Sequence, residues 1–309
     1  MMRSICLLLV ACCLFVLSSC KEKMDEDEVL QIGITPCQQQ PAFVRGTGLN
    51  PQRSAFSTSE KKIMGLALVQ LPADPADTSG RRTWQHPSWN RFGYMGSITT
   101  DENGNAYTSP FPVINILDNP PEKQNIIYKV ATADGEMRPL IDLPMPAKPT
   151  SGNIFGLLGL YYDCHAKKIY ASSVAGSTRD LENGIIYAVD PADGKITDKL
   201  TGRDALGLCV CGITGEKRLY FGSSRTSDIY SVELTRDGHF TGPVKKEFTL
   251  DLLGPRGDDK ARKIRFDKSG IMNIFGVEFN YNLTAPAEKQ ETVYRFSYDE
   301  EEKKWVPVK

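Results

Sequence analysis

The sequence predicts an all-β protein that folds as a single β-propeller of four-stranded antiparallel blades. The main observation is one apolar strand pattern that recurs four times, each time before a turn containing Asp. A second observation is that another hairpin precedes each copy, with Asn-Gly or Ser-Gly among its turns, which are strong hairpin signals. The third is that no helical periodicity competes with these patterns. The recurring runs are residues 125–130, 184–189, 228–232 and 292–296.

Each recurring strand is flanked by runs that complete a four-stranded module. Upstream of it lie two short apolar or alternating runs, which we interpret as the first and second strands. They are residues 98–101 with 106–107, 158–163 with 168–170, 206–211 with 218–220, and 264–267 with 272–275. A fourth run follows each copy, at residues 138–143, 196–200, 244–250 and 305–308. Self-similarity of this kind is typical of a propeller, whereas a β-sandwich would lack the repeat.

A fifth copy is predicted near the N-terminus. Residues 53–59 and 63–68 resemble the second and third strands of the module that contains Arg218, and its first strand is unclear. Five modules are therefore visible, and the length of residues 30–309 is compatible with five or six blades.

The hairpin turns at residues 100–107 and 266–270 resemble those of NHL and gluconolactonase-like (SMP-30-type) propellers. That resemblance implies a divalent cation, often Ca²⁺, held near the central axis by carboxylate and amide oxygens. Asn153, Asp204 and Asp267 are candidates by position, but the Glu, Asn, Asn, Asp set of that family cannot be matched residue by residue. Asp101, Asp163 and Asp267 end first strands, where Asp usually serves the turn.

The N-terminus has the features of an export signal. Arg3 precedes an apolar run of 13 residues (5–17), which is too short to span a bilayer, and Ser18 and Ser19 precede Cys20. Residues 17–20 resemble the bacterial lipobox, which implies cleavage after residue 19, lipidation of Cys20 and anchoring in the outer membrane. Residues 20–29 are then expected to be a solvated acidic tether, which also resembles a tag for surface export. The remainder, 30–309, is the predicted propeller, which is either surface-exposed or periplasmic.

We expect a binding site on the face that carries the long loops. The richest loop contains Trp84, His86, Trp89 and Arg91, in which rings with polar tips suit a sugar or an aromatic ligand. The alternative is that these rings pack between blades. The full set of predicted contacts is Trp84, His86, Trp89, Arg91, Asn153, Arg203 and Asn280, with Asn115, Arg179, Arg225 and Arg256 as possible members of the same face.

Composition and motifs restrict the function. With 37 Lys and Arg against 38 Asp and Glu, no basic field favours nucleic acid. The chain contains no P-loop, Gly-x-Ser-x-Gly elbow or His-Glu-x-x-His motif. We therefore favour a module without a cofactor that binds a glycan, a peptide or an envelope protein. The alternative is a cation-dependent SMP-30-like hydrolase.

Four cysteines remain after the predicted processing: Cys37, Cys164, Cys209 and Cys211. A disulfide between Cys37 and Cys164 and a zinc site built from the cysteines and His165 are both open to an exported protein. Burial of Cys209 and Cys211 as small apolar side chains is a third interpretation.

Overall fold

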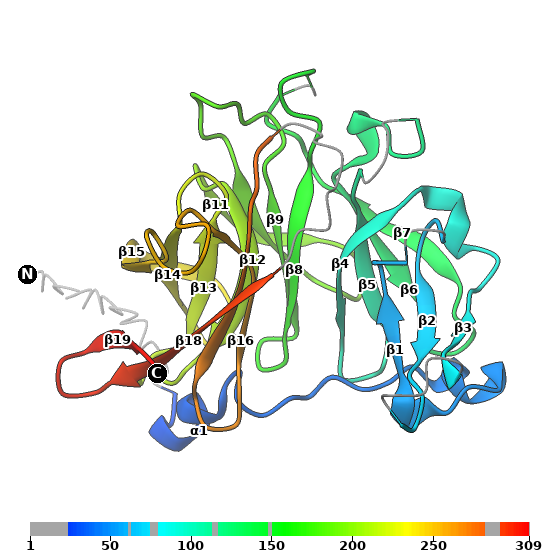
Figure 1. The fold of residues 1–309 in the computed structure, drawn as a ribbon, viewed down its shortest axis with the longest axis horizontal. Helices are drawn as coiled ribbons and strands as arrows, with labels where there is room; N and C mark the ends of the chain where they lie inside the picture. Colours follow the sequence, from blue (N-terminus) through cyan, green and yellow to red (C-terminus); the bar gives the residue numbers. More distant parts are fainter. Residues whose placement is uncertain are drawn as a thin grey trace, which may run out of the picture.

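Five antiparallel sheets are arranged in sequence order around one axis (Figure 1). The computed structural model describes residues 24–60, 63–74, 80–112, 117–147, 150–281 and 291–308. Blade 1 contains β1 (Ser54–Ser57), β2 (Ala67–Gln70) and β3 (Arg82–Trp84). The four-stranded blade 2 contains β4 (Met95–Thr100), β5 (Ala106–Pro110), β6 (Ile126–Val130) and β7 (Met137–Asp142), and blade 3 contains β8 (Leu157–Asp163), β9 (Lys168–Ser173), β10 (Ile185–Val189) and β11 (Ile196–Thr201). Blade 4 contains β12 (Ala205–Cys211), β13 (Arg218–Ser223), β14 (Asp228–Leu234) and β15 (Phe240–Thr249), and blade 5 contains β16 (Lys260–Phe266), β17 (Met272–Val277), β18 (Thr292–Asp299) and β19 (Lys304–Pro307).

The predicted β-propeller is confirmed, and of the two blade counts left open, five or six, the structure has five. Strands within each blade pair consecutively, and β4, β8, β12 and β16 lie against one another as the innermost strands. In each of blades 2 to 5 the pairing of the first two strands is interrupted by a β-bulge, for example between Ala205 and Leu208. A bulge adds local twist, so its repetition bends every inner strand in the same way.

Blade 1 agrees with its prediction in part. Its described part has three strands: β1 lies within the expected run 53–59, and β2 overlaps the expected run 63–68 only at Ala67 and Leu68. Ser57 pairs with Ala67, so the segment between them connects the two strands, and the third strand is β3. That strand begins at Arg82, just where the sequence was interpreted as a long loop.

Apolar side chains fill the spaces between adjacent blades. One buried cluster joins blades 1 and 2, and others join blades 2 and 3, 3 and 4, and 4 and 5. Ile264 and Ile274 of blade 5, for instance, pack in the same cluster as Tyr220 of blade 4. In the described ranges none of the clusters combines residues of blades 5 and 1. The first and last blades are therefore not held together by a shared core.

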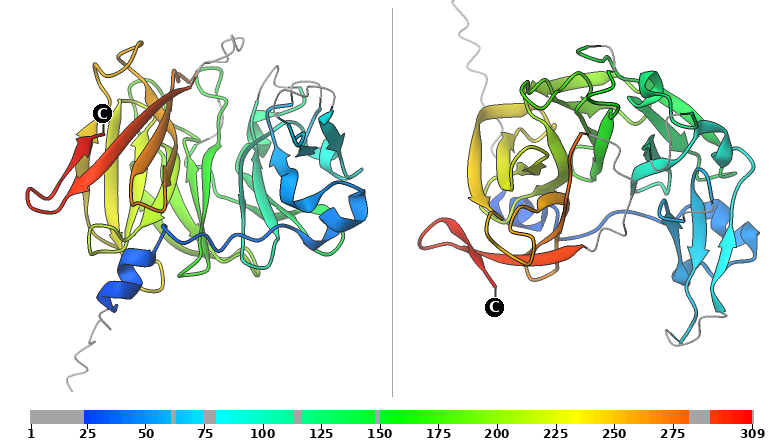
Figure 2. Two further views of the ribbon diagram at one scale, coloured as in Figure 1. Left: turned by 60° about the horizontal axis from the view of Figure 1, so that its bottom comes forward. Right: turned by 45° about the horizontal axis from the view of Figure 1, so that its top comes forward.

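The two faces of the ring are unlike each other. We call one of them the turn face. It carries the hairpin turns that join the first strand of a blade to the second and the third strand to the fourth. The opposite loop face carries the second-to-third strand loops and the connections between blades, such as 174–184 and 202–204. Figure 2 shows the N-terminal segment running along the turn face from beneath blade 4 to blade 1.

This segment, residues 32–53, is called the strap, and it contacts one blade after another. Gly212 of blade 4 donates its backbone N–H to Ile32, and Ile34 packs on the core between blades 4 and 5. Cys37 forms a disulfide with Cys164 in the β8–β9 turn of blade 3. The final contacts are with blades 2 and 1, through the bonds Gln39 N to Asp101 O (3.0 Å), Phe43 N to Thr132 O (3.0 Å) and Gln40 Nε2 to Ser54 O (3.0 Å).

The strap approaches blade 4 closely because Gly33 has no side chain. Its φ of +78° lies in the left-handed region, and a Cβ at this position would stand 2.1 Å from the carbonyl oxygen of Val210. The strap also includes two of the 3-10 helices, whose described bounds are η1 (Ala42–Thr47), η2 (Pro51–Arg53), η4 (Trp89–Phe92) and η5 (Pro121–Lys123).

A short helix begins within the predicted acidic tether, residues 20–29, of which the structure describes residues 24–29. Helix α1 (Glu26–Gln31) begins at the N-cap Asp25, whose carboxylate accepts from Asp27 N, and buries Val29 against blade 4. Glu28 pairs with His165 at 2.9 Å on the turn face. The acidic residues at 25–27 are exposed, while Met24 and Val29 supply the apolar contacts.

The predicted signal peptide 1–19 and Cys20 lie outside the described residues. Within the described ranges there is no helix of the length and apolarity that a bilayer crossing requires.

Replacing Cys37 and Cys164 together by Ser is expected to destabilise the fold by about 2–5 kcal/mol, since the disulfide closes a loop spanning 127 positions. Urea unfolding of the purified protein measures the difference. Adding a reductant should lower the stability of the unchanged protein by a similar amount and leave the double variant unaffected. Equal stabilities of the oxidised protein and the variant would contradict this role of the disulfide.

Candidate functional site

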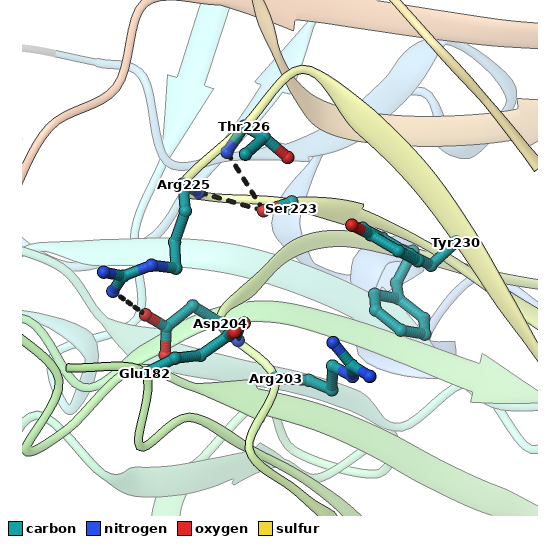
Figure 3. Close-up of a pocket in the computed structure, with 8 residues that line it drawn as sticks. Glu182, Arg203, Asp204, Ser223, Arg225, Thr226 and Tyr230 are labelled. Carbon is teal, nitrogen blue, oxygen red and sulfur yellow. Dashed lines mark hydrogen bonds and ion pairs between the residues drawn. The ribbon is translucent and has the colours of Figure 1, made fainter. Parts of the chain in front are cut away.

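A small polar pocket of about 140 Å³ opens on the loop face of blade 4 (Figure 3). It lies where the inter-blade connection before β12 meets the β13–β14 loop and the β9–β10 loop. The lining residues are Glu182, Arg203, Asp204, Phe221, Ser223, Arg225, Thr226 and Tyr230. Four of the eight carry a formal charge, two of each sign, so its wall offers both hydrogen-bond donors and acceptors.

Asp204 is the centre of the hydrogen bonds beneath this pocket. Its carboxylate is fully buried, and Oδ1 accepts from Ser177 Oγ and from the backbone N–H of Gly184 at 2.8 Å. Oδ2 accepts from Arg225 Nη1 at 2.9 Å and from the Tyr281 hydroxyl at 2.5 Å. A buried carboxylate that accepts from this many donors fixes the loops that provide them.

Arg225 joins three segments of the loop face. Besides Asp204, its guanidinium donates to the backbone oxygens of Thr178 at 2.8 Å and Arg179 at 2.5 Å. Although burial opposes it, the hydrogen bond that Arg225 donates to Asp204 raises the pKa of Arg225, which keeps the guanidinium charged. Burial first, and the Asp204 bond second, raise the pKa of Tyr281, so its hydroxyl stays protonated and donates.

Arg203 has a different environment from Arg225. Its guanidinium lies over the ring of Tyr230, 5.6 Å from the centroid, and Tyr230 is stacked on Phe221. In the described part of the chain it makes no ion pair. A planar guanidinium supported on an aromatic ring presents donors at fixed angles, and this geometry suits a carboxylate.

An aromatic row continues from the pocket across the loop face. Phe111 of blade 2, Phe155 before blade 3 and Phe279 after β17 stand 5.5 Å apart in succession, and Phe279 meets Tyr281 edge-on at 5.6 Å. Because the Tyr281 hydroxyl binds Asp204, the row and the polar pocket form one connected surface.

The aromatic loop that was predicted to bind a ligand does not lie at this pocket. Trp89 is fully buried, its indole N–H donates to Gly135 O at 2.7 Å, and it packs edge-on against Trp84 at 5.2 Å. His86 is fixed by Ser88, whose hydroxyl lies 2.7 Å from Nδ1. The cluster lies at the β6–β7 turn, on the turn face, and it forms the core between blades 1 and 2. The packing alternative thus describes Trp89, while Arg91 is exposed at the surface.

The other predicted contacts divide into two kinds. Arg203 lines the pocket, as the loop-face prediction expects. Asn153 is buried and uses its amide within the loop face, donating to Val174 O at 2.7 Å and accepting from Phe155 N at 2.9 Å. Asn280 is half-buried and engaged in contacts, and Asn115 lies outside the described residues. Arg256 of the Arg-Gly-Asp tripeptide binds Asp259 with two guanidinium nitrogens.

The candidate metal ligands and the cysteines serve structure. Asp101, Asp163 and Asp267 accept backbone N–H groups within their own hairpin turns. No three His, Cys, Asp or Glu side chains of the described residues are grouped as a metal site requires. The zinc alternative is overturned for Cys37 and Cys164 by their disulfide. Burial raises the pKa of the free Cys209 thiol to about 12.

No protein-family model matches the chain, and no curated protein matches it. Among solved structures, a nidogen/laminin complex aligns at 13% identity and a TM-score of 0.44, over 78% of this chain and 88% of that one. A calcium-binding regucalcin from Agrobacterium tumefaciens aligns at 17% identity and a TM-score of 0.34, over 65% and 70%. An auxiliary nutrient-binding protein from Bacteroides ovatus aligns at 14% identity and a TM-score of 0.38, over 75% and 47%. Likenesses this distant carry no information about a ligand.

Trp89→Ala is expected to cost about 3–5 kcal/mol of folding stability, because it leaves a cavity in a closed core. Arg91→Ala, two positions along, should stay within about 0.5 kcal/mol because its side chain is exposed. Chemical denaturation of both variants measures their free energies of unfolding. A small loss for Trp89→Ala would show that the ring is not part of the core, and would return it to the list of ligand contacts.

Proposed function

We propose that this protein is a lipid-anchored protein of the bacterial cell envelope that binds an acidic sugar unit of a glycan in the pocket beside Arg203. The observation that carries the proposal is the Arg203 guanidinium, which is supported by Tyr230 and has no ion-pair partner among the described residues. An acidic sugar brings a carboxylate for Arg203 and hydroxyls that can donate to Glu182. It needs no bound metal or cofactor.

The size of the pocket favours a single small unit. About 140 Å³ is well below the 300–1,000 Å³ of sites that enclose drug-sized ligands. A terminal sugar therefore enters, and the rest of the glycan extends over the loop face. The partly exposed Phe279 and Tyr281 offer rings for that extension, since sugar faces stack on aromatic side chains.

Two features support placement in the envelope. The lipobox-like residues 17–20 follow an export signal. The disulfide between Cys37 and Cys164 is of a kind that persists in oxidising compartments such as the periplasm or the cell surface. Lipid anchoring at Cys20, with the propeller on either side of the outer membrane, completes the proposal.

Arg203→Gln is expected to weaken binding of a disaccharide ending in glucuronate roughly 10- to 100-fold, the range for losing a hydrogen-bonded charge pair. Calorimetric titration measures the affinity. Arg179→Gln is the matched control, because Arg179 is exposed on the same face and its side chain is not part of the pocket. The corresponding disaccharide ending in glucose should bind weakly to all three proteins.

Two outcomes would contradict this assignment. If an acetylated dipeptide with a free carboxylate binds tighter than the sugar, and still depends on Arg203, the ligand is a peptide end. If excess Ca²⁺ raises the melting temperature by several degrees and EDTA reverses it, a bound cation is present and the hydrolase alternative gains support. Unchanged melting and unchanged sugar affinity in EDTA agree with the proposal.

Cys20→Ala is expected to abolish incorporation of labelled palmitate and to move the protein from the membrane fraction to the soluble fraction. Acyl chains contribute about 0.8 kcal/mol per buried methylene, so their loss removes the anchor. Cys12→Ala, within the predicted signal peptide, is the control and should change neither property. Continued membrane association of the unlabelled Cys20→Ala protein would contradict lipid anchoring.

A further inference from the structure

The β-sheet of blade 5 has two faces with different surroundings. On one face Ile264, Ile274 and Tyr294 are paired side by side and pack against blade 4. In a ring, the other face would meet the next blade, which is blade 1. Blade 1 makes no comparable contact with blade 5 within the described ranges, and Figures 1 and 2 show the two sheets well apart.

This uncovered face, called the basic face, carries cations and apolar side chains in register. Lys263, Phe275 and Val293 form one cross-strand row, because Lys263 pairs with Phe275 and Phe275 with Val293. The next row consists of Arg265, Asn273 and Arg295. Both arginines are exposed, and Val293 is 52% exposed, which is high for an apolar side chain in the middle of a strand.

The positive charge of the basic face is only partly compensated, because Glu291 lies near Lys263 and Asp267 contacts Asn273. Within the described residues none of Lys263, Arg265 and Arg295 forms an ion pair, and the neighbouring Glu291 pairs with Arg262 instead. Burial, followed by the charge of Arg265, lowers the pKa of Lys263. The acidic turn at 299–302 begins four residues beyond Arg295, about 13 Å along the strand.

The composition of β16 agrees with a face that is never covered by a blade of its own chain. The equivalent inner strand β12 is buried at all seven positions, as expected for a strand between two blades. In β16 only Ala261 and Ile264 are buried, and the intervening positions are basic. A second copy of the chain would bring the same charges together, so it is a poor occupant.

We infer that the basic face is a docking surface for an acidic polypeptide segment of a partner protein, laid along the sheet in the place of a neighbouring blade. Carboxylates at alternate positions would pair with Lys263, Arg265 and Arg295. Apolar side chains between them would cover Phe275 and Val293. A sulfated polysaccharide supplies the charge but not the apolar contact, and a lipid surface would meet apolar side chains at loop tips rather than at the centre of a sheet.

The test uses the purified full chain and two labelled 12-residue peptides of equal charge, one alternating Glu with Val and one alternating Glu with Ser. Fluorescence anisotropy at low salt gives the affinities. The triple variant K263Q/R265Q/R295Q should bind the Glu-Val peptide at least 10-fold more weakly. The control K123Q/K195Q/K199Q, which removes three exposed cations of blades 2 and 3, should change the affinity less than 2-fold.

The apolar part of the surface is tested separately. The unchanged protein should bind the Glu-Val peptide at least 3-fold more tightly than the Glu-Ser peptide, and Val293→Ser should remove that preference. Melting curves check folding, and R295Q alone replaces the triple variant if the latter is unfolded.

Three results would overturn the inference. The first is an equal loss of affinity in both triple variants, which would mean that only net charge matters. The second is equal affinity for the two peptides. The third is binding of dextran sulfate or of phosphatidylglycerol vesicles, dependent on the same three cations, with no peptide binding.

Discussion

The strap is the constraint on which the rest of the ring depends. Each sheet contains only strands that are consecutive in the sequence. In the described part of the chain, no N-terminal strand is therefore paired into the C-terminal blade, and no C-terminal strand into the N-terminal blade. The described blades 1 and 5 also share no buried cluster. What connects the five blades on one face is a single segment, hydrogen-bonded to blades 4, 2 and 1, packed on the core beside blade 5, and joined to blade 3 by a disulfide. Because the strap fixes the turn face, the loop face opposite can carry long connections without loosening the blades.

Two buried carboxylates hold the loops of the loop face in place, and their surroundings follow one pattern. Asp204 and Asp259 each stand one residue before the inner strand of a blade, and each binds an arginine from a loop and a tyrosine hydroxyl. Both carboxylate side chains have no exposed surface, so each pair is shielded and orders its loop. The binding pocket beside Arg203 is therefore framed by residues that are already held in place, which reduces the conformational entropy lost when a ligand binds.

The strands were predictable because the hydrophobic repeat reports burial, and burial between blades is the same in every module. The runs 125–130 and 184–189 were predicted to within one residue of the observed strands Ile126–Val130 and Ile185–Val189 for this reason. The residues of the candidate site were harder to predict from the sequence than the strands. Trp89 and Arg203 both suggested binding, but a sequence does not show whether an aromatic ring faces solvent or a neighbouring blade. Asp204, Arg225 and Tyr281 are 77 positions apart at their extremes and meet only through the fold. One signal is the Asp that directly precedes the observed inner strands β12 and β16, but the predicted strands began further along, at residues 206 and 264.

The contrast between β12 and β16 explains why the ring is open at one place. The strand Ala205–Cys211, which lies between blades 3 and 5, has seven buried residues. Lys260–Phe266 alternates basic and apolar side chains after its bulge, so only one of its faces can be buried without leaving charges unpaired. Closing blade 5 onto blade 1 would bury Lys263 and Arg265, neither of which has an ion-pair partner among the described residues. The sequence of this strand therefore disfavours closure by an apolar sheet and favours an occupant that brings carboxylates.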